Sequence, residues 1–172
     1  DPRRAAPLPR PLPQEHTPPG DLALVAVQAA LAADDLATAR HWIGLQPVAG
    51  TGSPPAVNWE LARALVSSAE GNKAQAIDIV QRVSKRTEGD GSPDDRVRAG
   101  VVEVWLLLAQ GQAEAASAVL GDLDTFNGSD YRVAWTSLAL YRALNDPAMV
   151  APALQRAEKL RGERMLSVRP VL

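Results

Sequence analysis

Four times along this chain, an apolar stretch with helical spacing ends at a short polar turn, and a small or β-branched residue follows five positions later. The four pairs of turn residue and following residue are Asp34 with Ala39, Gly71 with Ala76, Gly111 with Ala116, and Asn145 with Val150. A unit that recurs every 34 to 40 residues is typical of helical hairpins, because one hairpin alone cannot bury its apolar face. The spacing therefore predicts an all-α fold, a right-handed α-solenoid of about four helical hairpins.

The composition suits closely packed helices. Apolar residues make up 46% of the 172-residue chain, aromatic residues only 4%, and most of the apolar residues are Ala, Leu and Val. Ala lets helix backbones approach one another, while Leu fills the space between them. A chain of this length normally forms one domain.

Charge, hydropathy and cysteine content argue against several classes of function. The formal net charge of -2 lacks the basic character that binding to nucleic acid or to an anionic membrane surface requires. The longest apolar stretch, residues 101–109, contains Glu103 and falls well short of the roughly 20 residues that span a bilayer. The chain has no cysteine, which excludes a disulfide framework and a thiol nucleophile.

The source and the compartment are only weakly indicated. Fifteen arginines against three lysines are typical of a GC-rich, bacterial genome. The absence of cysteine is compatible with either the bacterial cytoplasm or the periplasm. The chain begins at Asp1 rather than Met, so we expect an upstream signal, anchor or domain that was removed or left out.

Residues 1–20 form a segment of their own, a proline-rich arm. They hold seven prolines together with Arg3, Arg4 and Arg10. Proline lacks a backbone donor and fixes φ, so this composition favours extended polyproline II structure. We interpret the arm as a semi-rigid linker. The alternative is a docking peptide that lies in a groove of another protein or along the surface of this chain. Residues 21–163 form the repeat domain, and residues 164–172 form a C-terminal tail.

Capping signals place the helix starts. Asp21 is the expected N-cap of the first helix, and Asp146 followed by Pro147 is the expected start of the last one. Ser92 with Pro93 and Asp95 is a strong start signal for the third hairpin. The expected helices cover residues 21–33, 36–46, 55–69, 73–85, 97–110, 113–123, 131–144 and 147–162, with loops at 48–55, 87–91 and 124–130.

The hairpins resemble degenerate tetratricopeptide repeats. The likeness is carried by residues 71–76 (Gly-Asn-Lys-Ala-Gln-Ala) and 111–116 (Gly-Gln-Ala-Glu-Ala-Ala), with bulky residues four positions after each small residue, at Ile43, Val80, Leu120 and Leu154. The glycine usual in the family's first helices is replaced by Val27, Ala64, Val104 and Leu138, so other helical-repeat families stay open. The resemblance implies an adaptor in a multiprotein assembly, which binds a peptide or protein on the concave face made by the first helices.

The residues that chemistry would need are scarce. The two histidines are His16, in the arm, and His41, which we interpret as a helix-surface residue. A histidine-based triad or metal cluster is therefore disfavoured, and no glycine-rich phosphate loop is present. The acidic loop at 87–91 lacks the ligand spacing of an EF-hand. We expect no enzymatic activity, no metal and no cofactor.

A partner-binding surface is easier to assign. In the register that the tetratricopeptide resemblance implies, the concave face includes Leu61, Leu65 and Val101, and its candidate contact residues are Asn58, Arg98, Trp105, Tyr131, Arg132, Trp135 and Arg142. Trp and Arg are over-represented at interface hot spots. The alternatives are that Trp105 belongs to the core and that the arginines are solvated or paired with carboxylates of the chain.

The sequence thus favours a non-enzymatic scaffold module that binds a protein or peptide partner within a larger assembly. One alternative is a regulatory or sensory helical-repeat domain cut from a longer bacterial transcription regulator or membrane-anchored protein. A third is a role in small-molecule binding or catalysis, which requires a deep pocket with convergent titratable groups.

Overall fold

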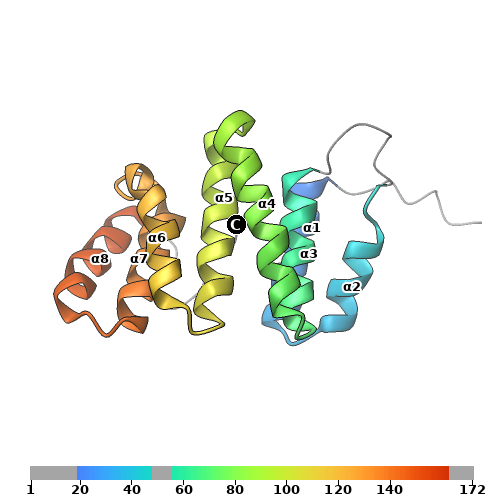
Figure 1. Cartoon of the computed structure of the whole chain (residues 1–172), viewed down its shortest axis with the longest axis horizontal. Coiled ribbons are helices and arrows are strands. Elements are labelled where there is room, and N and C mark those ends of the chain that lie inside the picture. The colour runs from blue at the N-terminus through green and yellow to red at the C-terminus, as the bar shows by residue number, and fades with distance from the viewer. Residues whose placement is uncertain (1–18, 48–55, 163–172) are drawn as a thin grey trace, which may run out of the picture.

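The polypeptide folds into antiparallel pairs of helices that follow one another along the long axis of the molecule (Figure 1). The computed structural model describes residues 19–47 and 56–162, and in these residues every regular element is helical. The all-α prediction is therefore confirmed. The elements are α1 (Gly20–Ala32), α2 (Leu36–Gly44), α3 (Val57–Ala69), α4 (Lys73–Asp90), α5 (Pro93–Leu108), α6 (Ala113–Asp122), the 3-10 turn η1 (Asp124–Phe126), α7 (Tyr131–Ala143) and α8 (Pro147–Leu160).

The four predicted turns share one backbone conformation. Their central residues all have positive φ, at 56° for Asp34, 88° for Gly71, 72° for Gly111 and 53° for Asn145. After each of them, the next amide donates to the carbonyl five residues earlier, at 2.9 to 3.0 Å (Asp35 to Ala30, Asn72 to Ser67, Gln112 to Leu107 and Asp146 to Tyr141). This bond closes a helix end around a left-handed residue. The sequence repeat is therefore a repeat of one local structure.

Packing joins each hairpin to the next. The helices α1, α3, α5 and α7 contact one another in succession, and α2, α4 and α6 each also contact the first helix of the next hairpin. The small residues after the turns, Ala39, Ala76 and Ala116, are fully buried, which lets the two helices of a hairpin approach closely. Four residues of the first helices are buried as well (Val27, Ala64, Val104 and Leu138). One apolar core therefore continues along the molecule.

The predicted caps are confirmed at α5 and α8 but not at α1. The Ser92 hydroxyl accepts from the Asp95 amide at 3.1 Å and donates to the Asp95 carboxylate at 2.8 Å. Asp146 accepts from the two amides that follow Pro147 at 3.1 and 3.2 Å. The prediction for Asp21 is wrong, because α1 begins at Gly20 and makes no side-chain cap bond. Asp21 bonds to side chains of other helices instead.

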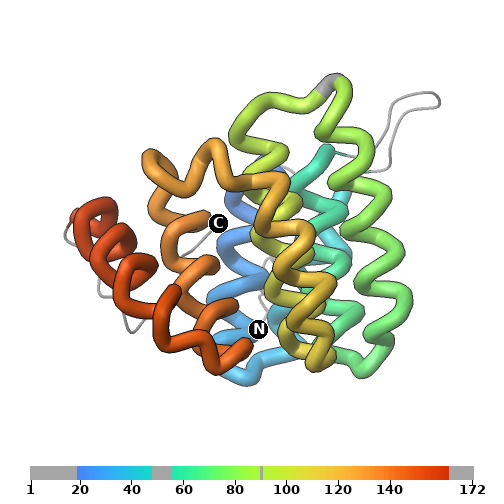
Figure 2. The backbone as a smooth tube through the Cα atoms, turned by 60° about the vertical axis from the view of Figure 1, so that its left-hand side comes forward, coloured from blue at the N-terminus to red at the C-terminus, as the bar shows by residue number. Residues whose placement is uncertain are grey.

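The predicted loop at 87–91 is helical up to Asp90, so α4 is longer than expected. Thr87 is only 3% exposed and donates its hydroxyl to the Ser84 carbonyl at 2.9 Å. Burial of Thr87 and packing on α5 outweigh the weak helix propensity of this segment. α4 and α5 project beyond the neighbouring hairpins (Figures 1 and 2). A Cβ at Gly91 would lie 2.6 Å from the Thr87 backbone, so glycine permits the close reversal into α5.

Three predicted segments lie outside the described residues. They are the proline-rich arm apart from its last two residues, the loop at 48–55, and the tail at 164–172.

Candidate functional site

The predicted contact residues lie on three first helices. Asn58 lies on α3, Arg98 and Trp105 on α5, and Tyr131, Arg132, Trp135 and Arg142 on α7. The structure brings the two tryptophans together, and it links Arg98 to Arg132 through a shared carboxylate. It buries Asn58 and Tyr131, which are each 8% exposed.

Five side chains form a chain of ion pairs across α1, α5 and α7, which we call the ion-pair ladder. Arg98 donates to Asp21 at 3.1 Å and to Asp94 at 2.8 Å. Arg132 donates to the other oxygen of Asp94 at 2.7 Å and to Asp130 at 2.6 Å. Both arginines are largely covered, with side chains 19% and 18% exposed. The ladder therefore uses their charges to join elements that are far apart in the sequence.

The ladder also reaches α3 through Asn58, and at its other end the pKa of Asp130 is shifted. Asn58 donates its side-chain amide to Asp21. Burial alone would raise the pKa of Asp130, but hydrogen bonds from Arg132 and the charge of its guanidinium outweigh it and hold that pKa below its ordinary value. The same hydrogen bond raises the pKa of Arg132. Both groups are therefore held in their charged forms, and three of the predicted contact residues have structural partners within the chain.

The two tryptophans form a half-buried aromatic pair between α5 and α7. Their ring centroids lie 5.0 Å apart with the planes inclined by 35°, which is a favourable arrangement for aromatic rings. The indole N–H of Trp105 donates to the Thr136 hydroxyl at 3.2 Å, so its ring is held in place. Arg142 is exposed two helical turns beyond Trp135. The pair therefore lies partly in the core and partly at the surface, whereas the sequence analysis had offered a core position and a surface contact as alternatives for Trp105.

The rest of the predicted concave face belongs to the core. Leu61 and Val101 are fully buried, and Leu65 is 6% exposed. Among the predicted contact residues Arg142 is exposed, while Trp105, Trp135, Arg98 and Arg132 are half-buried, and the two arginines are engaged in the ion-pair ladder. His41 is exposed on α2, which confirms its interpretation as a helix-surface residue.

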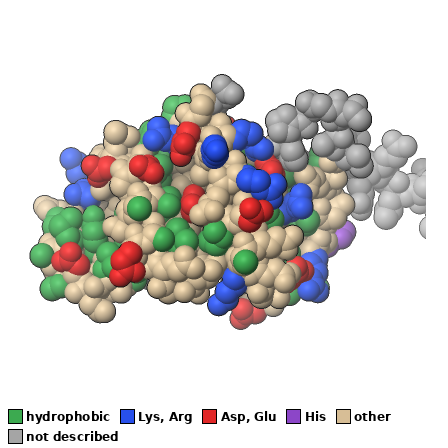
Figure 3. Space-filling view, in the orientation of Figure 1, with side chains coloured by type: hydrophobic (Ala, Val, Ile, Leu, Met, Phe, Trp, Pro, Cys, Tyr) green, Lys and Arg blue, Asp and Glu red, His purple; other side chains and the backbone are tan. Residues whose placement is uncertain are grey.

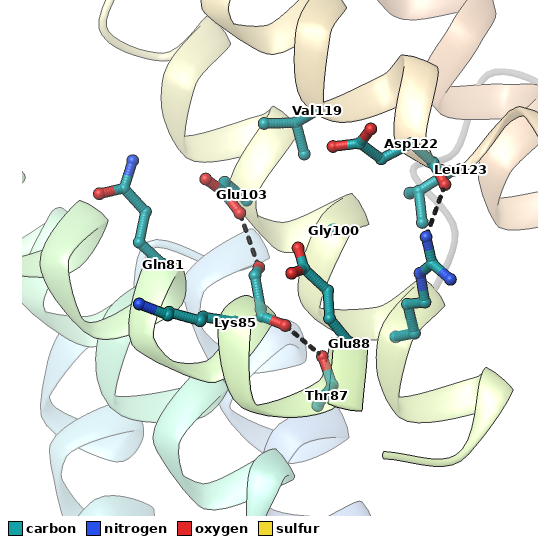
Figure 4. A pocket seen from close by; sticks show the side chains of 11 residues that line it. Gln81, Lys85, Thr87, Glu88, Gly100, Glu103, Val119, Asp122 and Leu123 are labelled. Carbon is teal, nitrogen blue, oxygen red and sulfur yellow. Dashed lines mark hydrogen bonds between the residues drawn. The ribbon is translucent and has the colours of Figure 1, made fainter. Parts of the chain in front are cut away.

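The sequence analysis missed a pocket on the other side of α5. This pocket, of about 310 Å³, lies between α4 and α6 and has α5 as its floor; we call it the α4–α6 pocket. Its lining includes Glu103 from α5, Ser84 and Glu88 from α4, and Asp122 from α6 (Figure 4). Glu103 is only 6% exposed. A single carboxylate within an otherwise apolar helical run was the one sequence signal for this site.

The remaining surface gives few indications of a site. Basic and acidic side chains are interspersed over the face seen in Figure 3, and apolar side chains gather at the end formed by α8. Residues 19–47 and 56–162 contain no group of three potential ligands able to hold a metal ion. Among the helices of these residues, none has both the length and the apolar character needed to cross a membrane.

Comparisons with known proteins add no identification. No family model, curated protein or solved structure matches the chain. The resemblance to tetratricopeptide repeats therefore stays a prediction based on the turns and on the spacing within the second helices.

Proposed function

We propose that this chain is a short α-solenoid that acts as a non-enzymatic protein-interaction module. In this proposal it binds a peptide or protein partner on the face of the first helices, as part of a larger assembly. The observation that carries the proposal is the half-buried pair Trp105 and Trp135, which offers aromatic surface between two successive first helices.

The repeated architecture supports a binding role. The first helices contact one another in succession, and each hairpin closes with the same left-handed turn. Arrays of this kind use a continuous surface rather than an enclosed cavity to bind their partners. A proposal of a scaffold is therefore consistent with the packing of α1, α3, α5 and α7.

The chemistry around the tryptophans supports the same surface. A fixed aromatic pair contributes contact area without a large loss of side-chain freedom on binding. Exposed Arg142, two helical turns further along α7, adds a positively charged donor to the same helix. In this proposal Arg98 and Arg132 hold the helices in register through the ion-pair ladder, and they contribute to binding by positioning α5 and α7. Asn58 and Tyr131 act in the same indirect way, because both are buried.

Site-specific photo-crosslinking tests the proposal. A photoreactive amino acid replaces Arg142 on α7 in one variant and Arg82, an exposed residue of α4, in a control variant. Both are expressed in the cells that naturally make the protein, and the adducts are identified by mass spectrometry. We expect one partner to be captured from position 142 and not from position 82. Capture of the same proteins from both positions, or from 82 alone, would contradict the assignment of this face.

A further inference from the structure

The α4–α6 pocket contains a buried carboxylate, Glu103, that has no counter-ion among the residues that the structure describes. The Glu103 side chain is bonded to one group of the described chain, the Ser84 hydroxyl, which donates to Oε2 at 2.6 Å. No lysine or arginine of the described residues forms an ion pair with it. Buried carboxylates are normally paired, because removing a charge from water is costly. The second oxygen of Glu103 is therefore open to a cation from outside this set of residues.

Two more carboxylates line the pocket, those of Glu88 and Asp122. Lys85 lines it as well, but in Figure 4 its ammonium group points away from Glu88 and Asp122. Arg96 also lines the pocket, but its guanidinium donates to the Asp122 backbone carbonyl at 3.2 Å. These carboxylates do not form a group that could hold a metal ion within the described residues. Three acidic residues, Glu88, Glu103 and Asp122, and two basic residues, Lys85 and Arg96, therefore line the pocket.

The walls of the pocket are partly apolar. Val119 of α6 and Leu123, the residue that follows α6, line one side, opposite α4. Gly100 forms part of the floor, and a Cβ at this position would lie 2.7 Å from the Leu123 side chain. The pocket thus combines a deep carboxylate with an apolar side, which matches a side chain that has a hydrocarbon stem and a charged end.

We propose that the α4–α6 pocket binds the guanidinium group of an arginine side chain and that Glu103 is its carboxylate partner. Guanidinium is planar, carries five donors and is more weakly hydrated than ammonium, so it pairs well with a partly buried carboxylate. The methylene groups of the arginine lie along Val119 and Leu123, and Glu88 and Asp122 add favourable charge to the lining. This site lies on the second-helix side of α5 and does not depend on the proposed function of the tryptophan surface.

An NMR titration of the full chain tests the proposal. The probe is N-acetyl-arginine amide, and its matched control is N-acetyl-citrulline amide, which has nearly the same shape and no charge. We expect the arginine probe, but not the citrulline probe, to shift the backbone amides of Ser84, Gly100 and Glu103. Glu103→Gln should weaken binding of the arginine probe by at least about 30-fold, because it removes one partner of a buried charge pair. Glu114→Gln removes the same charge from an exposed position of α6 outside the pocket and should leave the affinity unchanged.

The wild-type comparison keeps the test decisive even if Glu103→Gln alters the fold. Equal shifts with the two probes, or no shifts at these amides at saturating arginine probe, would overturn the proposal. Equal affinity of wild type and Glu103→Gln would overturn it as well.

The guanidinium can come from another protein or from the chain's own arm, which carries Arg3, Arg4 and Arg10. The same titration on the full chain with these three arginines replaced by glutamine distinguishes the sources. Tighter binding of the probe assigns the pocket to the arm, because a competitor has been removed. Unchanged binding excludes the arm as the source of the guanidinium.

Discussion

Replacement of the turn glycines by alanine isolates the backbone conformation on which the repeated hairpin depends. Gly71 and Gly111 have φ of 88° and 72°, and a Cβ added at either one meets nothing within 4 Å. Steric contact therefore contributes nothing, and the effect on stability is conformational. A left-handed conformation costs an L-residue about 1–2 kcal/mol, offset by about 0.4–1 kcal/mol because alanine restricts the unfolded chain. Each of Gly71→Ala and Gly111→Ala should lower the free energy of unfolding by roughly 1 kcal/mol.

Gly121 provides the matched control, because it lies within α6 and its added Cβ also meets nothing within 4 Å. There the backbone is helical, so Gly121→Ala should raise the free energy of unfolding by roughly 0.5–1 kcal/mol. The three variants therefore make the same chemical change, and the predicted effects have opposite signs.

Urea denaturation followed by circular dichroism at 222 nm measures the differences, as shifts of the midpoint at an unchanged slope. In thermal unfolding, each kcal/mol corresponds to about 2–4 °C in a chain of this size. If Gly71→Ala or Gly111→Ala stabilises the protein as Gly121→Ala does, the left-handed turn is not the element that closes the hairpins.

Two further predictions concern the ladder and a helix cap. Arg132 lowers the pKa of Asp130 in the folded state. The charged Asp130 carboxylate therefore stabilises the fold above its unfolded pKa of about 3.9, and this stabilisation is lost as the pH falls through the lower pKa of the folded state. Thermal unfolding from pH 8 to pH 2 should therefore show Asp130→Asn less stable than wild type near neutrality, with a difference that disappears at the acidic end; a difference independent of pH would contradict the ion pair. Ser92→Ala removes the cap on the Asp95 amide and should lower the free energy of unfolding by about 1 kcal/mol, whereas Ser92→Thr should retain most of it; equal losses in chemical denaturation would show that the hydroxyl is not the cap.

Local signals in the sequence were sufficient to predict the hairpins. A left-handed residue, the small residue five positions later and the caps at Ser92 and Asp146 all act within a few residues, so their effects can be read without knowledge of the fold. The exceptions are at helix ends, where contacts with other helices determine the local structure. Thr87 lies in a helix because it is buried. The Asp21 carboxylate accepts hydrogen bonds from Asn58 and Arg98 and does not cap its own helix.

The candidate sites depend on contacts that the sequence does not specify. Asp21 and Arg98 are 77 positions apart, and their pairing follows from how α1 and α5 stack. For this reason the predicted arginines could be named, but their carboxylate partners could not. Glu103 was visible only as an interruption of an apolar run. Its meaning depends on the space between α4 and α6, which only the arrangement of the helices creates.

The central proposal, that a partner binds the first-helix face around the aromatic pair, is tested most directly by one affinity comparison. The partner captured from position 142 is titrated with wild type, Trp135→Ala and Trp42→Ala, the last removing a half-buried tryptophan from α2. A hot-spot tryptophan contributes about 2 kcal/mol or more, so Trp135→Ala should raise the Kd by roughly 30-fold, while Trp42→Ala leaves it within about two-fold of wild type. An unchanged Kd for Trp135→Ala, or an equal loss in both variants, would contradict the account.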